Sequence, residues 1–445
     1  MTSWKGGGLR PPSVDALTGL AIVLTAAAAG IGGVLTPHIE GDTIGLADGM
    51  RAAQQCWQTG RQPCPGITAY SLQQTVIAAV AVWNGASSEA TARVLSAFSA
   101  VSVGLLATLA LWLPSHHRAL WLGLVAAGPL LFYATSSFGE ALAAVSLVAF
   151  VAVLTRGNAP GRGRLLAIAA AAAWASLGKD TMPAVVGLLG LAAVWLDPRH
   201  PLGARSRMAA TAGGVALAAV LFAWFHWFRL GEFYNAEYVD HPEFFLWSPR
   251  DVSSAFFGHW VSPSAGLLWF WPLGAAILVR SGKHGLIGAI VIALYALGLS
   301  RWWSPYGWVA WGDRLLYPLV SATAFLCLAV RSRHVRVPVW VWGISSVAAL
   351  AAVAVSQDST VLAVFFSPDA AYPGPPTIQA DVELYRAFLR HLTWTRTLRL
   401  DLAFVGLRTP VGVTVAACVV AALGAAAWVE RAGCGSREGA SSIEA

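Results

Sequence analysis

The chain has 445 residues, of which 57% are hydrophobic and 11% are charged, whereas soluble domains carry about 25% charged residues. This composition excludes an ordinary soluble protein. The net charge of +7 does not indicate nucleic-acid binding, because the basic residues are scattered through short loops. Uncharged apolar runs must satisfy their own backbone hydrogen bonds in hydrocarbon, so we expect a polytopic membrane protein made of α-helices.

The apolar runs set the expected number of membrane spans at about 12, since a helical span takes roughly 20 apolar residues. They fall at 15–37, 91–113, 118–135, 140–155, 164–177, 182–196, 208–228, 264–279, 284–300, 315–330, 337–356 and 403–429. A shorter run, 69–84, is expected to lie along the outer surface or dip into it. We therefore predict an all-α single membrane domain, residues 15–430, between cytoplasmic residues 1–14 and a cytoplasmic tail, 431–445.

The loops between the runs differ in charge on the two sides of the membrane. Short basic loops follow every second run, at 114–118, 156–164, 197–207, 280–285 and 331–336. The positive-inside rule puts these loops, and both termini, in the cytoplasm. The other face carries the long connections 38–68, 229–262, 301–313 and 357–402, which are rich in Trp, Tyr, Phe and Pro. Because function concentrates in long, varied loops, we expect the site on the extracytoplasmic face.

The first outer loop begins with HIEGDT, residues 38–43, and continues from Thr43 with the spacing of an amphipathic surface helix. Asp42 is either the N-cap of that helix or a carboxylate that performs chemistry at the membrane surface. Later in the loop, Cys56 and Cys64 are the first and last residues of CWQTGRQPC. A disulfide between them is possible, because the extracytoplasmic side of the membrane is oxidising. No Cys or His cluster has metal-ligand spacing, so we predict no metal site.

Two short outer turns each carry a charged residue. In YATSSFGEAL, Glu140 is either an ordinary first-turn acid, with Ser136 or Ser137 as the helix cap, or a functional acid. In GKDT, residues 178–181, Lys179 either pairs with Asp180 or holds a lipid phosphate.

A third outer stretch, RWWSPYGWVAWGDRLLYPLV, spans residues 301–320 and places aromatic residues before Arg314. The planar guanidinium suits phosphate, and the start of the next helix also favours anions. The alternative is an interfacial aromatic belt with an Arg that extends towards water.

Taken in order, these residues resemble the GT-C type polyprenyl-phosphate-dependent membrane glycosyltransferases, in particular bacterial mannosyl- or arabinosyltransferase-like members. In that family the first loop often reads G-D-E and the late motif W-G-P-R-x-L-L-P. Here they read Gly41-Asp42-Thr43 and Trp311-Gly312-Asp313-Arg314-Leu315-Leu316-Tyr317-Pro318, and FFGHWVSPSAGLLWFWPLGAAIL (256–278) is similar to a third family segment. The chain departs from the family at Thr43, Asp313 and Ala265. Thr43 leaves one acid in place of an Asp-Glu pair, so a divalent metal cofactor is not supported.

The resemblance implies inverting transfer of a sugar, with mannose or arabinofuranose favoured, from a polyprenyl-phosphate donor. The implied acceptor is a glycan, lipid or protein at the outer face of the plasma membrane. Asp42 is implied as the general base, with Glu140 positioning the acceptor. The implied ligands of the donor phosphate are Arg314, Lys179 and Arg301. Candidates for contacts with the sugar or the acceptor are Trp302, Trp303, Trp308, Trp311, His241 and His259.

Two other functions are compatible with the same sequence. A transporter or lipid flippase of the cell envelope predicts ionisable residues in the middle of spans, but nearly all charges here lie at span ends. A non-catalytic assembly protein that keeps the fold would account for the departures from the family motifs.

Overall fold

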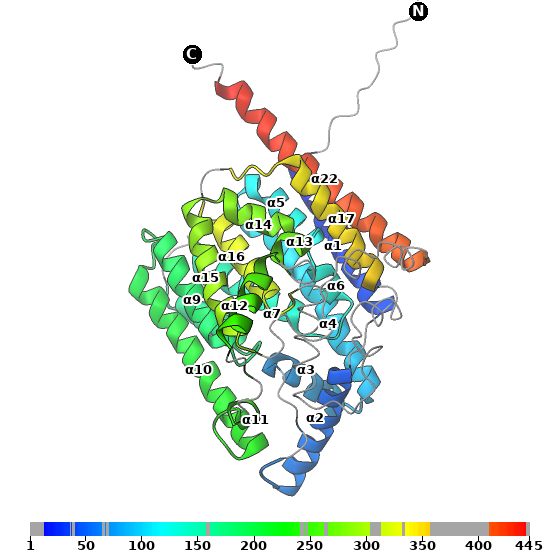
Figure 1. Cartoon of the computed structure of the whole chain (residues 1–445), viewed down its shortest axis with the longest axis vertical. Helices are drawn as coiled ribbons and strands as arrows, with labels where there is room; N and C mark the ends of the chain where they lie inside the picture. The colour runs from blue at the N-terminus through cyan, green and yellow to red at the C-terminus, as the bar shows by residue number, and fades with distance from the viewer. Residues whose placement is uncertain are drawn as a thin grey trace, which may run out of the picture.

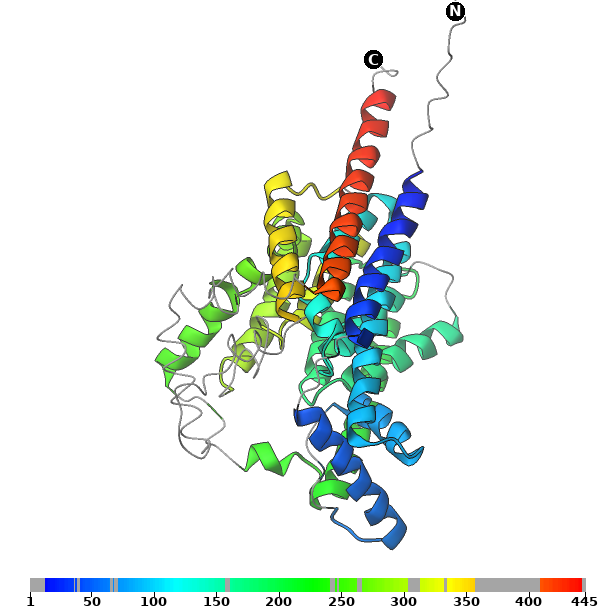
Figure 2. The ribbon, with the colours of Figure 1, turned by 90° about the vertical axis from the view of Figure 1, so that its right-hand side faces the viewer.

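The computed structural model describes residues 13–35, 37, 41–64, 67, 71–156, 161–240, 245, 248–261, 266–302, 313–331, 334–356 and 409–441. These residues are mainly helical, and an isolated antiparallel bridge pairs Phe245 with Trp302. Helix α1 (Val14–Leu35) begins, and helix α22 (Pro410–Ser441) ends, at one end of the molecule. Helices α2 (Gly41–Thr59) and α11 (Ala236–Val239) lie at the opposite end (Figure 1 and Figure 2).

The other described helices follow one another with short connections. In the first half they are α3 (Leu72–Trp83), α4 (Ser88–Thr108), the 3-10 helix η1 (Leu109–Trp112), α5 (Ser115–Ala126), α6 (Leu130–Ala134), α7 (Glu140–Thr155), α8 (Arg162–Ser176), α9 (Met182–Leu196) and α10 (Ala204–Leu230). In the second half they are α12 (Pro249–Val261), α13 (Leu267–Phe270), α14 (Pro272–Arg280), α15 (Lys283–Leu299), α16 (Tyr317–Val330) and α17 (Val339–Ser356).

Four of the described helical segments are long and apolar enough to cross a membrane, namely Val14–Leu35, Ser88–Trp112, Ala204–Leu230 and Pro410–Glu430. Shorter apolar helices accompany them, including α7, α9, α15 and α16. By length and composition, these helices confirm an all-α membrane protein. The number of spans, about 12, stays a prediction. Helix α22 continues to Ser441, into the segment expected to form the cytoplasmic tail.

Two of the expected spans are interrupted by proline. The run 118–135 divides into α5 and α6 around Pro129, and the run 264–279 divides into α13 and α14 before Pro272. Proline has no backbone N–H and its ring clashes with the preceding turn, so it ends a helix or begins a new one. The expectation of single continuous helices was wrong at both places.

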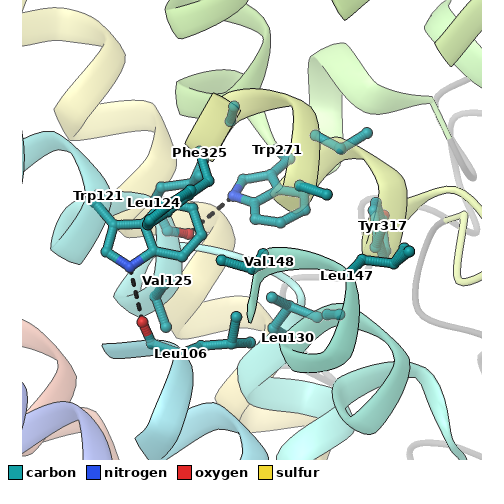
Figure 3. Packing of buried hydrophobic residues seen from close by; sticks show 14 of the residues in the cluster. Leu106, Trp121, Leu124, Val125, Leu130, Leu147, Val148, Trp271, Tyr317 and Phe325 are labelled. Atoms are coloured by element: carbon teal, nitrogen blue, oxygen red, sulfur yellow. Dashed lines mark hydrogen bonds between the residues drawn. The ribbon is translucent and has the colours of Figure 1, made fainter. Parts of the chain in front are cut away.

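The main hydrophobic core lies between the central helices and contains two buried tryptophans with satisfied N–H groups (Figure 3). Trp121 donates to the Leu106 carbonyl at 2.8 Å, and Trp271 donates to the Leu124 carbonyl at 3.0 Å. Phe325 of α16 packs edge-on against Trp121, with ring centroids 5.0 Å apart. These contacts fasten α16 to α5, and thereby hold the helix that follows Arg314.

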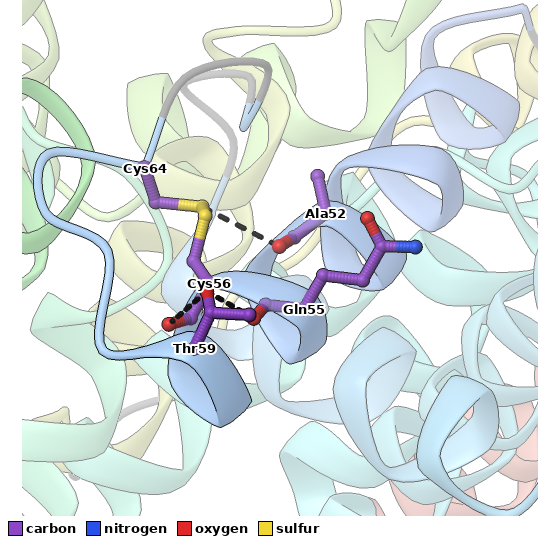
Figure 4. Close-up of a disulfide and its surroundings, with 5 residues drawn as sticks. All are labelled: Ala52, Gln55, Cys56, Thr59 and Cys64. Atoms are coloured by element: carbon purple, nitrogen blue, oxygen red, sulfur yellow. Dashed lines mark hydrogen bonds between the residues drawn. A yellow bond between two sulfur atoms is a disulfide. The ribbon is translucent and has the colours of Figure 1, made fainter.

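A second, smaller core joins α2 to α3 and to the end of α10. Cys56 and Cys64 are joined by a disulfide in this core (Figure 4). The Cys64 amide also donates to the Phe228 carbonyl of α10 at 3.0 Å. The expected amphipathic helix is present, but it begins at Gly41. Asp42 therefore lies in the first turn of α2, and its interpretation as the N-cap was wrong.

Candidate functional site

The turn before Glu140, residues 135–139, is buried and polar, so its backbone needs hydrogen-bond partners from other elements. Gln74 of α3 donates from Nε2 to the Ser137 carbonyl at 2.9 Å. Ser99 of α4 donates from Oγ to the Phe138 carbonyl at 3.0 Å. Two neighbouring helices thus fix the turn that leads into α7.

Neither serine of this turn caps α7, contrary to one of the two interpretations of Glu140. The N-cap is Gly139, which makes no side-chain cap bond. A Cβ at Gly139 would lie 2.8 Å from Cδ of Gln74, so a larger residue would displace the side chain that binds the Ser137 carbonyl. The Ser136 hydroxyl instead accepts from the Phe138 amide at 3.1 Å. The Ser137 hydroxyl lies 2.8 Å from Oγ1 of Thr43, which links this turn to the first turn of α2.

The turn that carries Lys179 is held by Gln73, the residue next to Gln74 on α3. The side-chain Nε2 of Gln73 donates to the Trp174 carbonyl at 2.6 Å, and the backbone N–H of Gln73 donates to the Leu177 carbonyl at 3.3 Å. The adjacent glutamines therefore tie the turns of Lys179 and Glu140 to a single helix. Sequence reasoning missed them, although two consecutive glutamines inside the apolar run 69–84 were a visible signal.

The structure brings Glu140, Lys179 and Arg314 together at one end of the helix bundle. Lys179 Nζ lies 3.0 Å from Glu140 Oε1, and Arg314 Nε lies 3.7 Å from the same oxygen. The guanidinium of Arg314 also lies over the Phe138 ring, 4.0 Å from its centroid. The Glu140 side chain is only 2% exposed, whereas that of Lys179 is 30% exposed. We call these three residues the cation cluster.

Lys179 does not pair with Asp180, which was the alternative interpretation of the GKDT turn. Asp180 accepts from Nδ2 of Asn235 at 2.7 Å, and its carboxylate lies 3.7 Å from His226 Nε2. Lys179 is directed to Glu140 instead. Burial lowers the pKa of Lys179 below its ordinary value, while the neighbouring Glu140 carboxylate opposes this shift.

The cation cluster has two cationic side chains around one carboxylate, and some of its polar atoms form no hydrogen bond with the described residues. Within the described residues, Glu140 Oε2 and the Nε and Nη1 atoms of Arg314 are buried without a hydrogen-bond partner. Buried polar atoms of this kind are costly unless a ligand or water satisfies them. Because Arg314 presents N–H donors, the arrangement suits an anion such as phosphate.

His259, predicted as a contact to the sugar or the acceptor, is buried beside Asp313. Its Nδ1 is hydrogen-bonded to Oδ2 of Asp313, and both side chains are fully buried. The other Asp313 oxygen accepts from the Leu316 amide at 3.2 Å, and the Asp313 amide donates to Oη of Tyr317 at 3.0 Å. Burial raises the pKa of the Asp313 carboxyl, and the His259 contact opposes this. The sequence marked Asp313 only as a departure from the family motif.

The remaining candidates lie at the edge of the described structure or beyond it. Trp302 packs edge-on against Tyr238 and Phe245, with ring centroids 5.0 and 5.7 Å away. Arg301 is exposed just after α15. The side chain of Asp42 lies outside the description, as do Trp303, Trp308, Trp311 and His241. Among the side chains that are described, no three His, Cys, Asp or Glu residues are grouped so that they could hold a metal ion.

Comparison with known proteins gives two solved structures that are similar to most of this chain. Both are of ArnT from Cupriavidus metallidurans, one in the apo state and one bound to undecaprenyl phosphate. The apo structure is 17% identical, with a TM-score of 0.49, and the match covers 93% of this chain and 76% of ArnT. The bound structure is 17% identical, with a TM-score of 0.46, over 94% and 76%. No protein-family model and no curated protein sequence matches the chain.

Proposed function

We propose that the chain is an integral-membrane glycosyltransferase of the GT-C type. In this proposal it moves a sugar from a polyprenyl-phosphate donor to an acceptor at the extracytoplasmic face. The supporting observation is the cation cluster: Glu140, Lys179 and Arg314 come from three turns far apart in the sequence and converge at one end of the bundle. These are the charged residues whose order along the chain resembles that family.

The two cations meet the chemical need of the donor. When the sugar leaves, the phosphodiester becomes a phosphomonoester, so negative charge grows on the phosphate and must be stabilised. Lys179 contributes a compact charge, and Arg314 contributes N–H donors in a planar fork. The buried surroundings strengthen both interactions, because less water screens them.

Glu140 has two parts to play in this proposal. Its Oε1 is shared by Lys179 and Arg314, so the carboxylate keeps the two cations at a fixed separation before the donor arrives. Its Oε2 has no partner within the described residues and is open to a hydroxyl of the sugar or the acceptor. Glu140 thus prepares the phosphate site and orients the reacting hydroxyl.

Asp42 acts as the general base in the proposed reaction. Its carboxylate takes the proton of the acceptor hydroxyl as the oxygen attacks the anomeric carbon. The phosphate leaves from the opposite side, which inverts the configuration. Support comes from the neighbouring Thr43, whose hydroxyl contacts Ser137 three positions before Glu140. This contact brings the first turn of α2 to the turn that leads into the cation cluster.

The finer assignments belong to the same proposal. The sugar is mannose or arabinofuranose, and the acceptor is a glycan, lipid or protein of the cell envelope. Both termini are cytoplasmic and the cation cluster faces the outside. Contacts with the sugar or the acceptor come from Trp302, Trp303, Trp308, Trp311 and His241, and Arg301 assists at the phosphate. No divalent metal is needed, because Lys179 and Arg314 supply the positive charge.

The test is transfer of labelled sugar from polyprenyl-phosphate donors to extracted lipids in membranes that contain wild-type or Asp42→Asn protein. We expect at least a 100-fold lower rate in Asp42→Asn, the usual scale for loss of a general base. Asp48→Asn is the matched control, since Asp48 lies on the same helix but is exposed and paired with Arg51 at 2.8 Å. Undiminished transfer by Asp42→Asn overturns the base assignment. Substrate flux in vesicles without transfer from any donor indicates a transporter or flippase.

A further inference from the structure

The buried His259–Asp313 pair joins two elements that meet around Arg314. His259 lies in α12, which belongs to the long segment 229–262, whereas Asp313 immediately precedes Arg314. A buried carboxylate is costly unless it is paired and hydrogen-bonded. Here both Asp313 oxygens are used, one by His259 and one by the Leu316 amide.

The contacts of Asp313 restrain the backbone on both sides of Arg314. Its amide donates to Tyr317 Oη, and its carboxylate accepts from the Leu316 amide, so residues 313–317 form one hydrogen-bonded unit. Tyr317 is itself fully buried and packs edge-on against Trp271, with ring centroids 5.5 Å apart. This unit therefore sets the direction in which the Arg314 side chain leaves the backbone. His259 of α12 holds the unit in place through its hydrogen bond with Asp313.

We propose that His259 and Asp313 are positioning residues that aim Arg314 at the donor phosphate and make its position depend on the docking of α12. This inference rests on the proposed function. His259 fixes one Asp313 carboxylate oxygen, and the Leu316 amide fixes the other. Without His259, one oxygen of this buried carboxylate loses its partner, and the unit that sets the direction of Arg314 is loosened. Helix α12 and the proposed phosphate site are thereby coupled.

The test is a double-mutant cycle on the affinity of the purified, full-length protein for undecaprenyl phosphate in detergent. We expect His259→Ala to weaken binding about tenfold, an effect within the range of coupling between residues of one hydrogen-bonded network. Arg314→Ala weakens binding by at least as much. The double variant His259→Ala/Arg314→Ala binds no more weakly than Arg314→Ala, because residues that act through one group are not additive. His259→Asn, whose amide nitrogen can take the place of the imidazole Nδ1 as a donor to Asp313, retains most of the affinity.

The matched control is His117→Ala. His117 is also fully buried, and its Nδ1 is hydrogen-bonded to the Leu328 carbonyl at the opposite end of α16 at 2.7 Å. Its loss disturbs the same helix without touching the unit around Arg314. We expect wild-type affinity for the lipid in His117→Ala, even if its thermal stability falls.

The outcomes separate this inference from the function on which it rests. Additive losses from His259→Ala and Arg314→Ala, with wild-type protein that binds the lipid, overturn the positioning role alone. Equal weakening by His117→Ala and His259→Ala likewise shows a general effect on folding. Wild-type protein that does not bind undecaprenyl phosphate overturns the proposed function, and the positioning role with it.

Discussion

Glu140 is the residue on which the two cations of the proposed phosphate site converge. Replacing it by Gln keeps the shape but leaves the partly buried Lys179 and Arg314 without their carboxylate. We expect the protein without lipid to lose about 3 kcal/mol of unfolding free energy, as when one partner of a buried ion pair is removed. Undecaprenyl phosphate should stabilise Glu140→Gln more than wild type, because its phosphate replaces the missing negative charge.

Thermal unfolding in detergent, with and without the lipid, measures this effect. Glu89→Gln is the control, since Glu89 pairs with Arg93 at 2.8 Å on an exposed surface. An exposed pair contributes at most about 1 kcal/mol. Equal losses in the two variants would contradict a special role for the buried carboxylate.

Lys179 predicts an alkaline limit to the activity. Only the protonated amine binds phosphate, and burial lowers its pKa below that of an exposed lysine. As pH rises through this lowered pKa, kcat/KM for the donor should therefore fall earlier than an ordinary lysine would allow. Lys179→Arg should move the fall to higher pH, because arginine stays protonated. A pH profile of kcat/KM that is identical in the two proteins would rule out Lys179 as the titrating group.

At the residue scale, the sequence predicts which charged side chains matter but not how they pair. Glu140 and Lys179 are recognisable because each stands in a short turn between apolar runs. Their contact depends on which helix ends meet, and that is decided by packing among helices far apart in the chain. The same holds for the contact between His259 and Asp313, which are 54 residues apart in sequence.

At the element scale, α2 carries Asp42 and is fastened at its far end by the Cys56–Cys64 disulfide. Replacing both cysteines by serine frees a loop with a sequence separation of 8. Loop entropy predicts a cost of about 2.5 kcal/mol. We expect faster proteolysis after residue 59 and less ordered α2, with transfer reduced as Asp42 loses its support. Mass mapping of unreduced protein checks the premise, and a free thiol at Cys56 would contradict it.

Element boundaries follow sequence rules where proline or glycine acts locally. Pro129 and Pro272 break two apolar runs because neither can donate the hydrogen bond that a continuous helix needs. Hydropathy depends only on the apolar character of the residues and does not register the missing N–H donor, so both runs were expected as single spans. The buried glutamines of α3 show the reverse case. Two polar residues inside an apolar run are visible in the sequence, but the carbonyls that they bind are not.

At the scale of the whole molecule, the alternation of helices predicts that every second turn lies on the same side. The contacts agree: Glu140 and Lys179 meet at one end, while His117 meets the Leu328 carbonyl at the end of α16 away from Arg314. The fold class and the meeting of Glu140, Lys179 and Arg314 at one end were thus predictable. The packing order, and with it the cation cluster, was not.

The orientation in the membrane gives a further prediction. In a background without other free cysteines, Glu232→Cys should react with an impermeant maleimide on intact cells. Arg199→Cys should react only after permeabilisation, because it belongs to a basic loop expected in the cytoplasm. Both positions are exposed in the structure. The opposite labelling pattern would place the cation cluster inside the cell and exclude the proposed donor geometry.

The central claim is that Lys179 and Arg314 bind the phosphate of a polyprenyl-linked sugar during transfer. Its most direct test is kcat/KM for the labelled donor in wild type, Lys179→Ala and Arg314→Ala, with Arg93→Ala as an exposed arginine control. We predict transfer by wild type, losses of about 100-fold or more in the two cation variants, and near wild-type transfer in the control. Undiminished transfer by Lys179→Ala and Arg314→Ala, or no transfer by wild type from any donor, would contradict it.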